Sequence, residues 1–226
     1  RRHTRYISVT GVQTCALPIY LANAQDTNSP NLISGFNSNG FGIGVAYSDV
    51  NASNNKYVSW TFRKQAKFFD IVTYTGNNGS QTISHNLGSV PGCIIVKCVT
   101  GADDWFVYHN SLGTSNYLKL DTTDVSATSA GFWGSVTSTS FGTTTAINAN
   151  GQTYVAYLFA HNAGGFGLTG TDNVISCGSF TCDGSGNATV NLGYEPQWLL
   201  VKRTSSATDW HIYDTMRGWT FNDAGN

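Results

Sequence analysis

The strongest constraint on the fold of this chain is that one stretch returns later in the sequence without a gap. The residues from Asn86 to Gly113 have counterparts from Asn191 to Gly218, always 105 positions later (191 − 86 = 105; 218 − 113 = 105). The counterparts include identical residues that we expect in the core of each copy, namely Pro91 and Pro196, Trp105 and Trp210, and Tyr108 and Tyr213. Such a repeat indicates an array of one structural module.

A second repeat defines the domain layout. Tyr57 and its neighbours return at Tyr154, a shift of 97 positions (154 − 57 = 97). Superposing both repeats predicts that residues 20–64 are the C-terminal part of an upstream module and that residues 65–166 are a complete module. Residues 167–226 are then the N-terminal part of a third module. Complementary partial modules suggest pairing as a circularly permuted second module, which predicts ladder contacts between the Tyr57–Phe62 strand and residues 174–214.

The N-terminal segment is excluded from the fold prediction. The string Val9–Ile19 resembles the translation of a common sequencing adapter. An export signal is the alternative, because Arg1 and Arg2 are basic and Ala22–Ala24 resembles a cleavage site, but Pro18 and several polar residues interrupt the apolar stretch. We therefore interpret residues 1–19 as an artefact and expect the chain to be a fragment.

Composition and periodicity together predict an all-β fold. Aromatic residues make up 13% of the 226 residues, and glycine occurs 25 times. Period-two alternation predicts strands joined by short turns, as in an antiparallel sandwich or jelly roll. The predicted strands are Thr82–Asn86, Gly92–Val99, Asp104–His109, Tyr117–Asp121, Tyr154–Ala160, Val174–Phe180, Ala188–Leu192, Gln197–Arg203 and Asp209–Tyr213.

Charge and apolar runs exclude two classes of partner. Only 11% of residues are charged and the formal net charge is −1, so the chain lacks the basic patches that hold nucleic acid. No apolar run approaches the ~20 residues of a membrane span. We expect neither a nucleic-acid partner nor a membrane span.

Histidine and cysteine residues of one copy do not recur at the equivalent positions of the next. His85 aligns with Val190 and His109 with Asp214, and Cys93 aligns with Trp198. The sequence therefore predicts no catalytic residue, no metal site, no cofactor and no module-wide disulfide. Asp104 and Asp209 do recur; a pair of glycosidase carboxylates is conceivable, but a turn-closing role explains the recurrence more simply. The loop from Asp183 to Asn187 predicts a hairpin rather than a calcium site, which would need a glutamate at its twelfth position.

Tryptophans and lysines complete the set of candidates. Trp105 and Trp210 lie in predicted strands, which favours core packing over stacking on a sugar. Trp133 and Trp219 do not recur, and we predict that they are exposed and contact a ligand. Lys97 and its counterpart, Lys202, each end an apolar strand, where we expect the ammonium group to lie in water and discourage edge pairing.

Four strings of the repeat also carry a resemblance to a known family: Phe69–Gly76, His85–Gly88, Tyr154–Ala160 and Trp198–Lys202. They resemble a tandem-repeat module of tail-fibre and other virion proteins of marine and environmental bacteriophages. The resemblance implies a structural or adhesive role in the virion, as a spacer or a receptor-binding surface, but no catalytic residues. It also implies host-surface glycans or other virion proteins as partners, and an oligomeric fibre. A lectin-like module or an accessory part of a polysaccharide depolymerase is the alternative.

Overall fold

A computed structural model of the chain describes residues 19, 22–25, 33–44 and 50–217. The chain divides into two compact units, one formed by Arg1–Pro18 with Gln25–Tyr57 and the other by Ile19–Ala24 with Val58–Asn226. In the first unit, β1 (Ile33–Asn37) and β2 (Gly40–Ile43) form an antiparallel hairpin. The predicted artefact, residues 1–19, lies outside the described residues except for Ile19.

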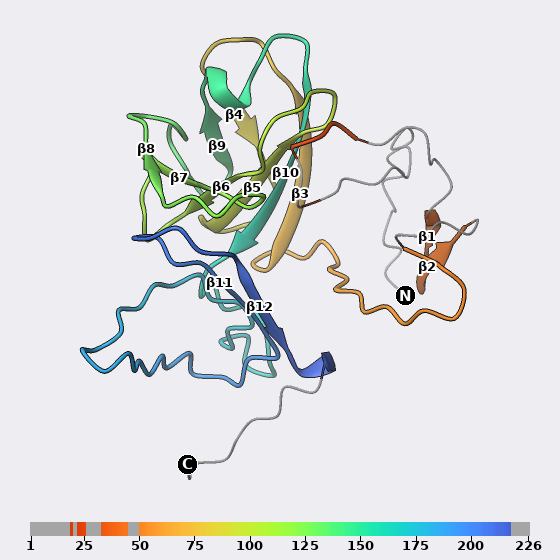
Figure 1. The fold of residues 1–226 in the computed structure, drawn as a ribbon, viewed down its shortest axis with the longest axis vertical. Helices are drawn as coiled ribbons and strands as arrows, with labels where there is room; N and C mark the ends of the chain where they lie inside the picture. The colour runs from red at the N-terminus through yellow and green to blue at the C-terminus, as the bar shows by residue number, and fades with distance from the viewer. Residues whose placement is uncertain (1–18, 20–21, 26–32, 45–49, 218–226) are drawn as a thin grey trace. The chain divides into compact units, whose positions relative to one another are not determined.

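The second unit contains a six-stranded antiparallel sheet (Figure 1). From edge to edge its strands are β3 (Phe69–Thr75), β10 (Thr153–Ala160), β5 (Pro91–Cys98), β6 (Phe106–His109), β7 (Asn116–Lys119) and β8 (Ala127–Thr128). Of the six strands of this sheet, the one that comes last in the chain, β10, therefore lies between β3 and β5. Its alternating sequence places Tyr154, Ala156 and Leu158 on one buried face.

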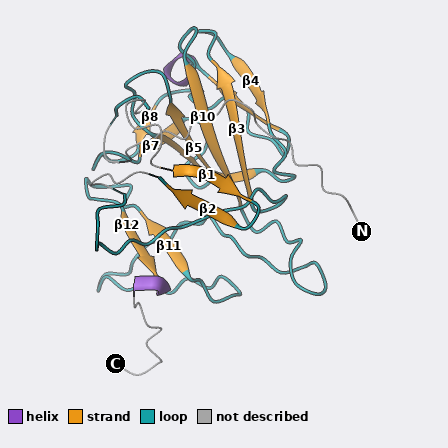
Figure 2. Cartoon of the chain, turned by 90° about the vertical axis from the view of Figure 1, so that its right-hand side faces the viewer, coloured by secondary structure: helices purple, strands orange, loops and turns teal. Residues whose placement is uncertain are grey.

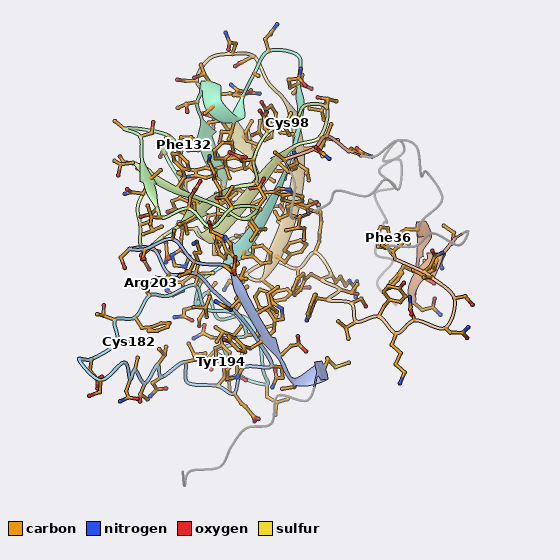
Figure 3. The ribbon with its side chains drawn as sticks, viewed as in Figure 1. Phe36, Cys98, Phe132, Cys182, Tyr194 and Arg203 are labelled. Carbon is orange, nitrogen blue, oxygen red and sulfur yellow. The ribbon has the colours of Figure 1, made fainter. Side chains whose placement is uncertain are left out.

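A smaller second layer covers that face of the sheet. It contains the antiparallel pair β4 (Gln81–Ser84) and β9 (Ser140–Thr143). Phe141 of β9 lies edge-on to Tyr74 of β3, with ring centroids 6.2 Å apart, and Tyr74 stacks on Tyr154 at 5.1 Å. Figure 3 shows Cys98 and Phe132 among the side chains of this core. The predicted all-β fold with antiparallel sheets is confirmed.

Helical structure is limited to two short 3-10 turns in the described residues, η1 (Thr145–Ile147) and η2 (Thr215–Arg217). Within those parts of the chain, no helix has the length and apolar character needed to cross a membrane.

A separate hairpin, β11 (Trp198–Val201) and β12 (His211–Asp214), repeats the register of β5 and β6 (Figure 2). Cys93 pairs with His109 in the main sheet, and Trp198 pairs with Asp214 in the hairpin. Each residue of the hairpin pair lies 105 positions after the corresponding residue of the main-sheet pair (198 − 93 = 105; 214 − 109 = 105). The sequence repeat is therefore also a repeat of backbone pairing.

Two predicted strands, Val174–Phe180 and Ala188–Leu192, are irregular in the structure, so their prediction is wrong. Residues 174–180 are the counterpart of β3, which in the main sheet pairs only with β10. Among the described residues, no strand forms a ladder with residues 174–180.

The expected pairing of the two partial modules is also wrong. Tyr57–Phe62, the sequence counterpart of β10, forms no strand. None of the ladders among the described residues joins Tyr57–Phe62 to residues 174–214. An extended segment of this length gains its stability from neighbouring strands.

Candidate functional site

The repeated aromatic residues of the complete module lie in its interior, as predicted. Trp105 is buried and stacks on Tyr157, with ring centroids 6.4 Å apart. Tyr108 and Pro91 are buried as well. Trp105 therefore presents no face on which a sugar ring could stack.

The prediction that Trp133 is exposed and contacts a ligand is wrong. Its side chain is fully buried, and its indole Nε1 donates a hydrogen bond to the carbonyl of Asn116 at 3.0 Å. Gly131 and Gly134 lie near it with positive φ angles of 69° and 54°, a conformation that favours glycine. The other predicted contact residue, Trp219, lies outside the described residues.

The third copy does not bury its repeated residues in the same way. Tyr213 is 38% exposed, whereas Tyr108 at the same repeat position is buried. Trp210 and Pro196 are half-buried. The predicted core role is therefore wrong for Tyr213 and only partly met by the other two, because among the described residues β11 and β12 form a two-stranded sheet with no further strand beside it.

The repeated lysines bind a carbonyl in the loop between the two strands of each hairpin, and the predicted placement in water is wrong for Lys97. Lys97 is buried, and its Nζ donates to the carbonyls of Asp103 at 2.7 Å and Ala22 at 3.0 Å. Lys202 donates to the carbonyl of Thr208 at 2.6 Å, the same repeat position as Asp103 (208 − 103 = 105). Burial lowers the pKa of both lysines, because desolvation penalises the ammonium form.

These loops also join successive copies. Lys202 donates to Thr123 at 3.0 Å, and the indole of Trp210 donates to the carbonyl of Lys119 at 2.8 Å. Ala22, which accepts from Lys97, lies 97 positions before Lys119, the shift of the second repeat (119 − 22 = 97). We call residues 22–24 and 119–126 the docking segments, because each receives the lysine loop of the following copy.

Backbone hydrogen bonds complete the junction with the third copy. Ser126 N donates to Thr204 O at 3.1 Å, and Thr208 N donates to Thr123 O at 3.0 Å. A shallow pocket opens at this junction, with residues from both sides in its lining: Tyr117, Lys119, Asp124, Val125, Ala127 and Ala207. The repeated pair Tyr20-Leu21 and Tyr117-Leu118, also 97 positions apart, is the sequence signal for the docking segments, and the sequence prediction missed it.

The candidate acidic residues have structural partners. Asp104 forms an ion pair with Lys119, with Oδ2 2.7 Å from Nζ, and so links the start of β6 to β7. Asp183 closes a turn, because its carboxylate accepts from Ser185 N and Asn187 N at 2.8 and 2.9 Å. The turn at Asp183 therefore forms without the flanking strands of the predicted hairpin.

Cysteine and histidine side chains meet at one place on the main sheet. Cys93 pairs with His109 across β5 and β6, and Cys177 N donates to His161 Nδ1 at 2.9 Å. A Cβ added at Gly92 would lie 2.5 Å from His161 Cβ and 2.8 Å from Cys177 Cβ, so these segments are tightly packed. Burial raises the pKa of both thiols, to about 12 for Cys177.

The thiols of Cys93 and Cys177 are free, as are those of Cys98 and Cys182. Over the described ranges, no group of three or more histidine, cysteine or acidic residues has a geometry that could hold a metal ion. Cys182 lies on an outlying loop, far from the labelled Cys98 (Figure 3).

Comparison with known proteins gives a family and no closer relative. No curated protein matches the chain, and no solved structure matches it. The match to one protein family covers residues 1–224, almost the whole sequence. The chain belongs to that family, which is described as a domain of unknown function (DUF7483).

Proposed function

We propose that this chain is a non-enzymatic structural or adhesion module, one link of a tandem array in a phage tail fibre or another virion appendage. The observation that supports an array is the repeated docking contact. Lys97 and Lys202 each donate to the carbonyl six positions downstream (103 − 97 = 6; 208 − 202 = 6) and to a docking segment of the preceding copy. An interface that recurs at successive junctions allows copies to be added without a new contact surface.

The assignment to a virion rests on the resemblance of the repeat strings to phage fibre modules. In that setting the array acts as a spacer or as a host-binding surface, outside the cell after release of the virion. Its partners are then host-surface glycans or other virion proteins, and the fibre is oligomeric. A carbohydrate-binding or depolymerase-associated role has weaker support, because the indoles of Trp105 and Trp133 are both buried.

A glycan array combined with a polysaccharide hydrolysis assay tests the adhesive and enzymatic alternatives. A spacer binds no glycan, and a receptor-binding surface binds without turnover. Hydrolysis of a capsular polysaccharide that disappears in Asp104→Asn would overturn the non-enzymatic proposal. Asp124→Asn is the matched control, because Asp124 also faces Lys119 but at 3.8 Å.

A proteolysis experiment tests the docking contact directly. Trp210→Phe removes the indole donor to Lys119 and keeps an aromatic ring at this position. We expect faster cleavage between residues 196 and 217, with the six-stranded sheet still protected. Lys64→Met, which removes an ion pair of an exposed lysine with Asp70, is the control. Unchanged cleavage in Trp210→Phe would contradict a stabilising junction.

A further inference from the structure

A pocket of about 480 Å³ lies in the part of the chain that follows the complete module. Its volume falls in the range of about 300–1,000 Å³ that is typical of small-molecule sites. Two segments form its lining, one within residues 167–174 and the other at Leu192–Tyr194. The contacts between copies described above use neither segment, so the pocket is separate from the docking contact.

The first of these segments is an insertion in the repeat. Phe69 and Phe166 are related by the shift of 97, whereas the pairs from Asn86 onward are related by the shift of 105. The copy that follows Phe166 therefore contains eight residues that the preceding copy lacks (105 − 97 = 8), and we place them at residues 167–174. Insertions in repeat proteins form loops on one face, which is often the face that binds a partner.

The insertion is a closed loop that holds a carboxylate in place. Asp172 N donates to Phe166 O at 3.0 Å, and Gly165 N donates to Gly170 O at 2.8 Å. Gly167 has a positive φ of 73°, and a Cβ added there would clash with Asp172 Oδ2. Glycine at position 167 therefore leaves the room that the Asp172 carboxylate occupies.

The insertion offers one acceptor group and one donor group to a ligand. Asp172 is exposed, and in the described part of the chain no hydrogen bond or ion pair engages its carboxylate. Asn173 is half-buried, and its Oδ1 accepts from Gly164 N at 2.9 Å. This bond fixes the side-chain amide of Asn173 and leaves its Nδ2 able to donate.

The second segment contributes an aromatic ring with a fixed position. Tyr194, labelled in Figure 3, is half-buried, and its hydroxyl donates to Ser176 Oγ at 3.0 Å. Ser176 Oγ in turn donates to Asn162 Oδ1. The counterpart of Tyr194 in the preceding copy is Ser89, so the ring, like the insertion, is particular to this copy (194 − 89 = 105). A ring that is already held in place loses little conformational entropy on binding.

These groups together match the chemistry of a neutral sugar. A pyranose ring has adjacent hydroxyl groups, which can donate to a carboxylate and accept from an amide, and a face of C–H groups that can pack on an aromatic ring. Among the described residues, the lining contains one carboxylate and no lysine or arginine. Like charges repel, so the pocket disfavours a sugar that carries a carboxylate or a phosphate.

We propose that this pocket binds one neutral hexose unit of a host-surface glycan. One sugar hydroxyl donates to the Asp172 carboxylate, an adjacent hydroxyl accepts from Asn173 Nδ2, and the C–H face lies against the ring of Tyr194. The site uses this tyrosine in place of the buried indoles of Trp105 and Trp133. The inference rests on the adhesive role proposed above and gives that role a site and a class of ligand.

Titration of the full chain with the methyl glycosides of glucose, galactose and mannose, monitored by NMR, tests the site. We expect at least one of them to bind with a Kd on the order of 1 mM, as a small ligand in an open pocket does. Asp172→Asn should weaken that binding about tenfold, because a hydrogen bond to a charged acceptor is stronger than one to a neutral acceptor. Asp183→Asn, which changes an exposed aspartate outside the pocket, is the matched control and should bind like the wild type.

A second pair of variants tests the aromatic ring. Tyr194→Ser introduces the residue of the preceding copy and should weaken binding by roughly tenfold. Tyr194→Phe keeps the ring and should retain most of the affinity. Near-ultraviolet circular dichroism checks that the complete module stays folded in every variant.

Three results would overturn the proposal, and they separate the site from the adhesive role. The first is no binding of any of the three methyl glycosides, in which case the glycan array decides independently whether the adhesive role stands. The second is unchanged affinity in both Asp172→Asn and Tyr194→Ser, which would place the adhesive surface elsewhere on the chain. The third is tighter binding of N-acetylneuraminic acid or of methylammonium than of the neutral glycosides, which would contradict the class of ligand.

Discussion

The hairpins β5–β6 and β11–β12 share a sequence pattern and a register but differ in surroundings. Ile94 of β5 is fully buried, while Leu199 at the same repeat position is 46% exposed. Val107 of β6 is buried and its counterpart Ile212 is exposed. The difference teaches that local sequence is enough to form the hairpin, whereas the core also needs β10 and the β4–β9 layer, which are distant in sequence from the hairpin.

The contacts that do not depend on β10 are the same in both hairpins. Each lysine holds the carbonyl six positions downstream, which closes the loop between its two strands. The lysine contact is therefore part of the hairpin itself. Burial of the apolar face, in contrast, requires the other strands of the complete sheet.

The largest expected difference between the two hairpins concerns their tryptophans. Trp105→Ala removes a buried indole and should lower the free energy of unfolding by about 3–5 kcal/mol. Trp210→Ala removes a half-buried indole with one hydrogen bond to Lys119, so its cost should be about 1 kcal/mol. Urea denaturation of both variants measures the difference. Equal losses would show that the third copy has a core of its own.

A smaller difference is expected for the lysines. Lys97→Met leaves two carbonyls in a buried site without their donor, which should cost about 1–3 kcal/mol. Lys202→Met acts at a half-buried site and should cost less than about 1 kcal/mol in the same urea experiment. A larger loss of stability in Lys202→Met than in Lys97→Met would contradict the conclusion that the lysine of the complete module contributes more.

The smallest expected effect is a pH dependence carried by His85. Burial lowers the pKa of His85 below its ordinary value of 6.5, although hydrogen bonding and Asp70 oppose the shift. The folded state then binds fewer protons than the unfolded state as pH falls below 6.5, so stability is present above that pH and is lost below it.

His85→Gln tests this dependence, because the third copy has the non-titrating Val190 at the same position. The free energy of unfolding should fall less in His85→Gln than in the wild type between about pH 7.5 and about pH 5. Identical slopes in the two proteins would assign the acid sensitivity to other groups.

The sequence predicted the positions of the repeated strands well, but it predicted their pairing and their environment poorly. The ungapped repeat located β5, β6, β11 and β12 to within a few residues, because alternation is a property of each strand. It did not predict that Lys97 is buried, since the carbonyls of Asp103 and Ala22 that make burial tolerable are brought there by the fold. Trp133 was misplaced for a similar reason, because its indole partner is the backbone of β7.

Five strands of the structure, β1, β2, β3, β8 and β9, were not predicted from the sequence. Phe69–Thr75 alternates between apolar and polar residues only in part, so period-two alternation did not identify it as a strand. The irregular state of residues 174–180 could not be predicted from those residues themselves, because it depends on a neighbouring strand.

The position of β10 has a consequence for the order in which the module folds. On a ribosome, β3 and β5 emerge well before the strand that separates them in the sheet, so they must wait for residue 160 before either gains its ladder with β10. Contacts of such long sequence separation slow folding and leave strand edges open in the meantime. In a chain with many copies, a nascent module could capture the central strand of its neighbour, so spacing between copies becomes a kinetic safeguard as well as a geometric one.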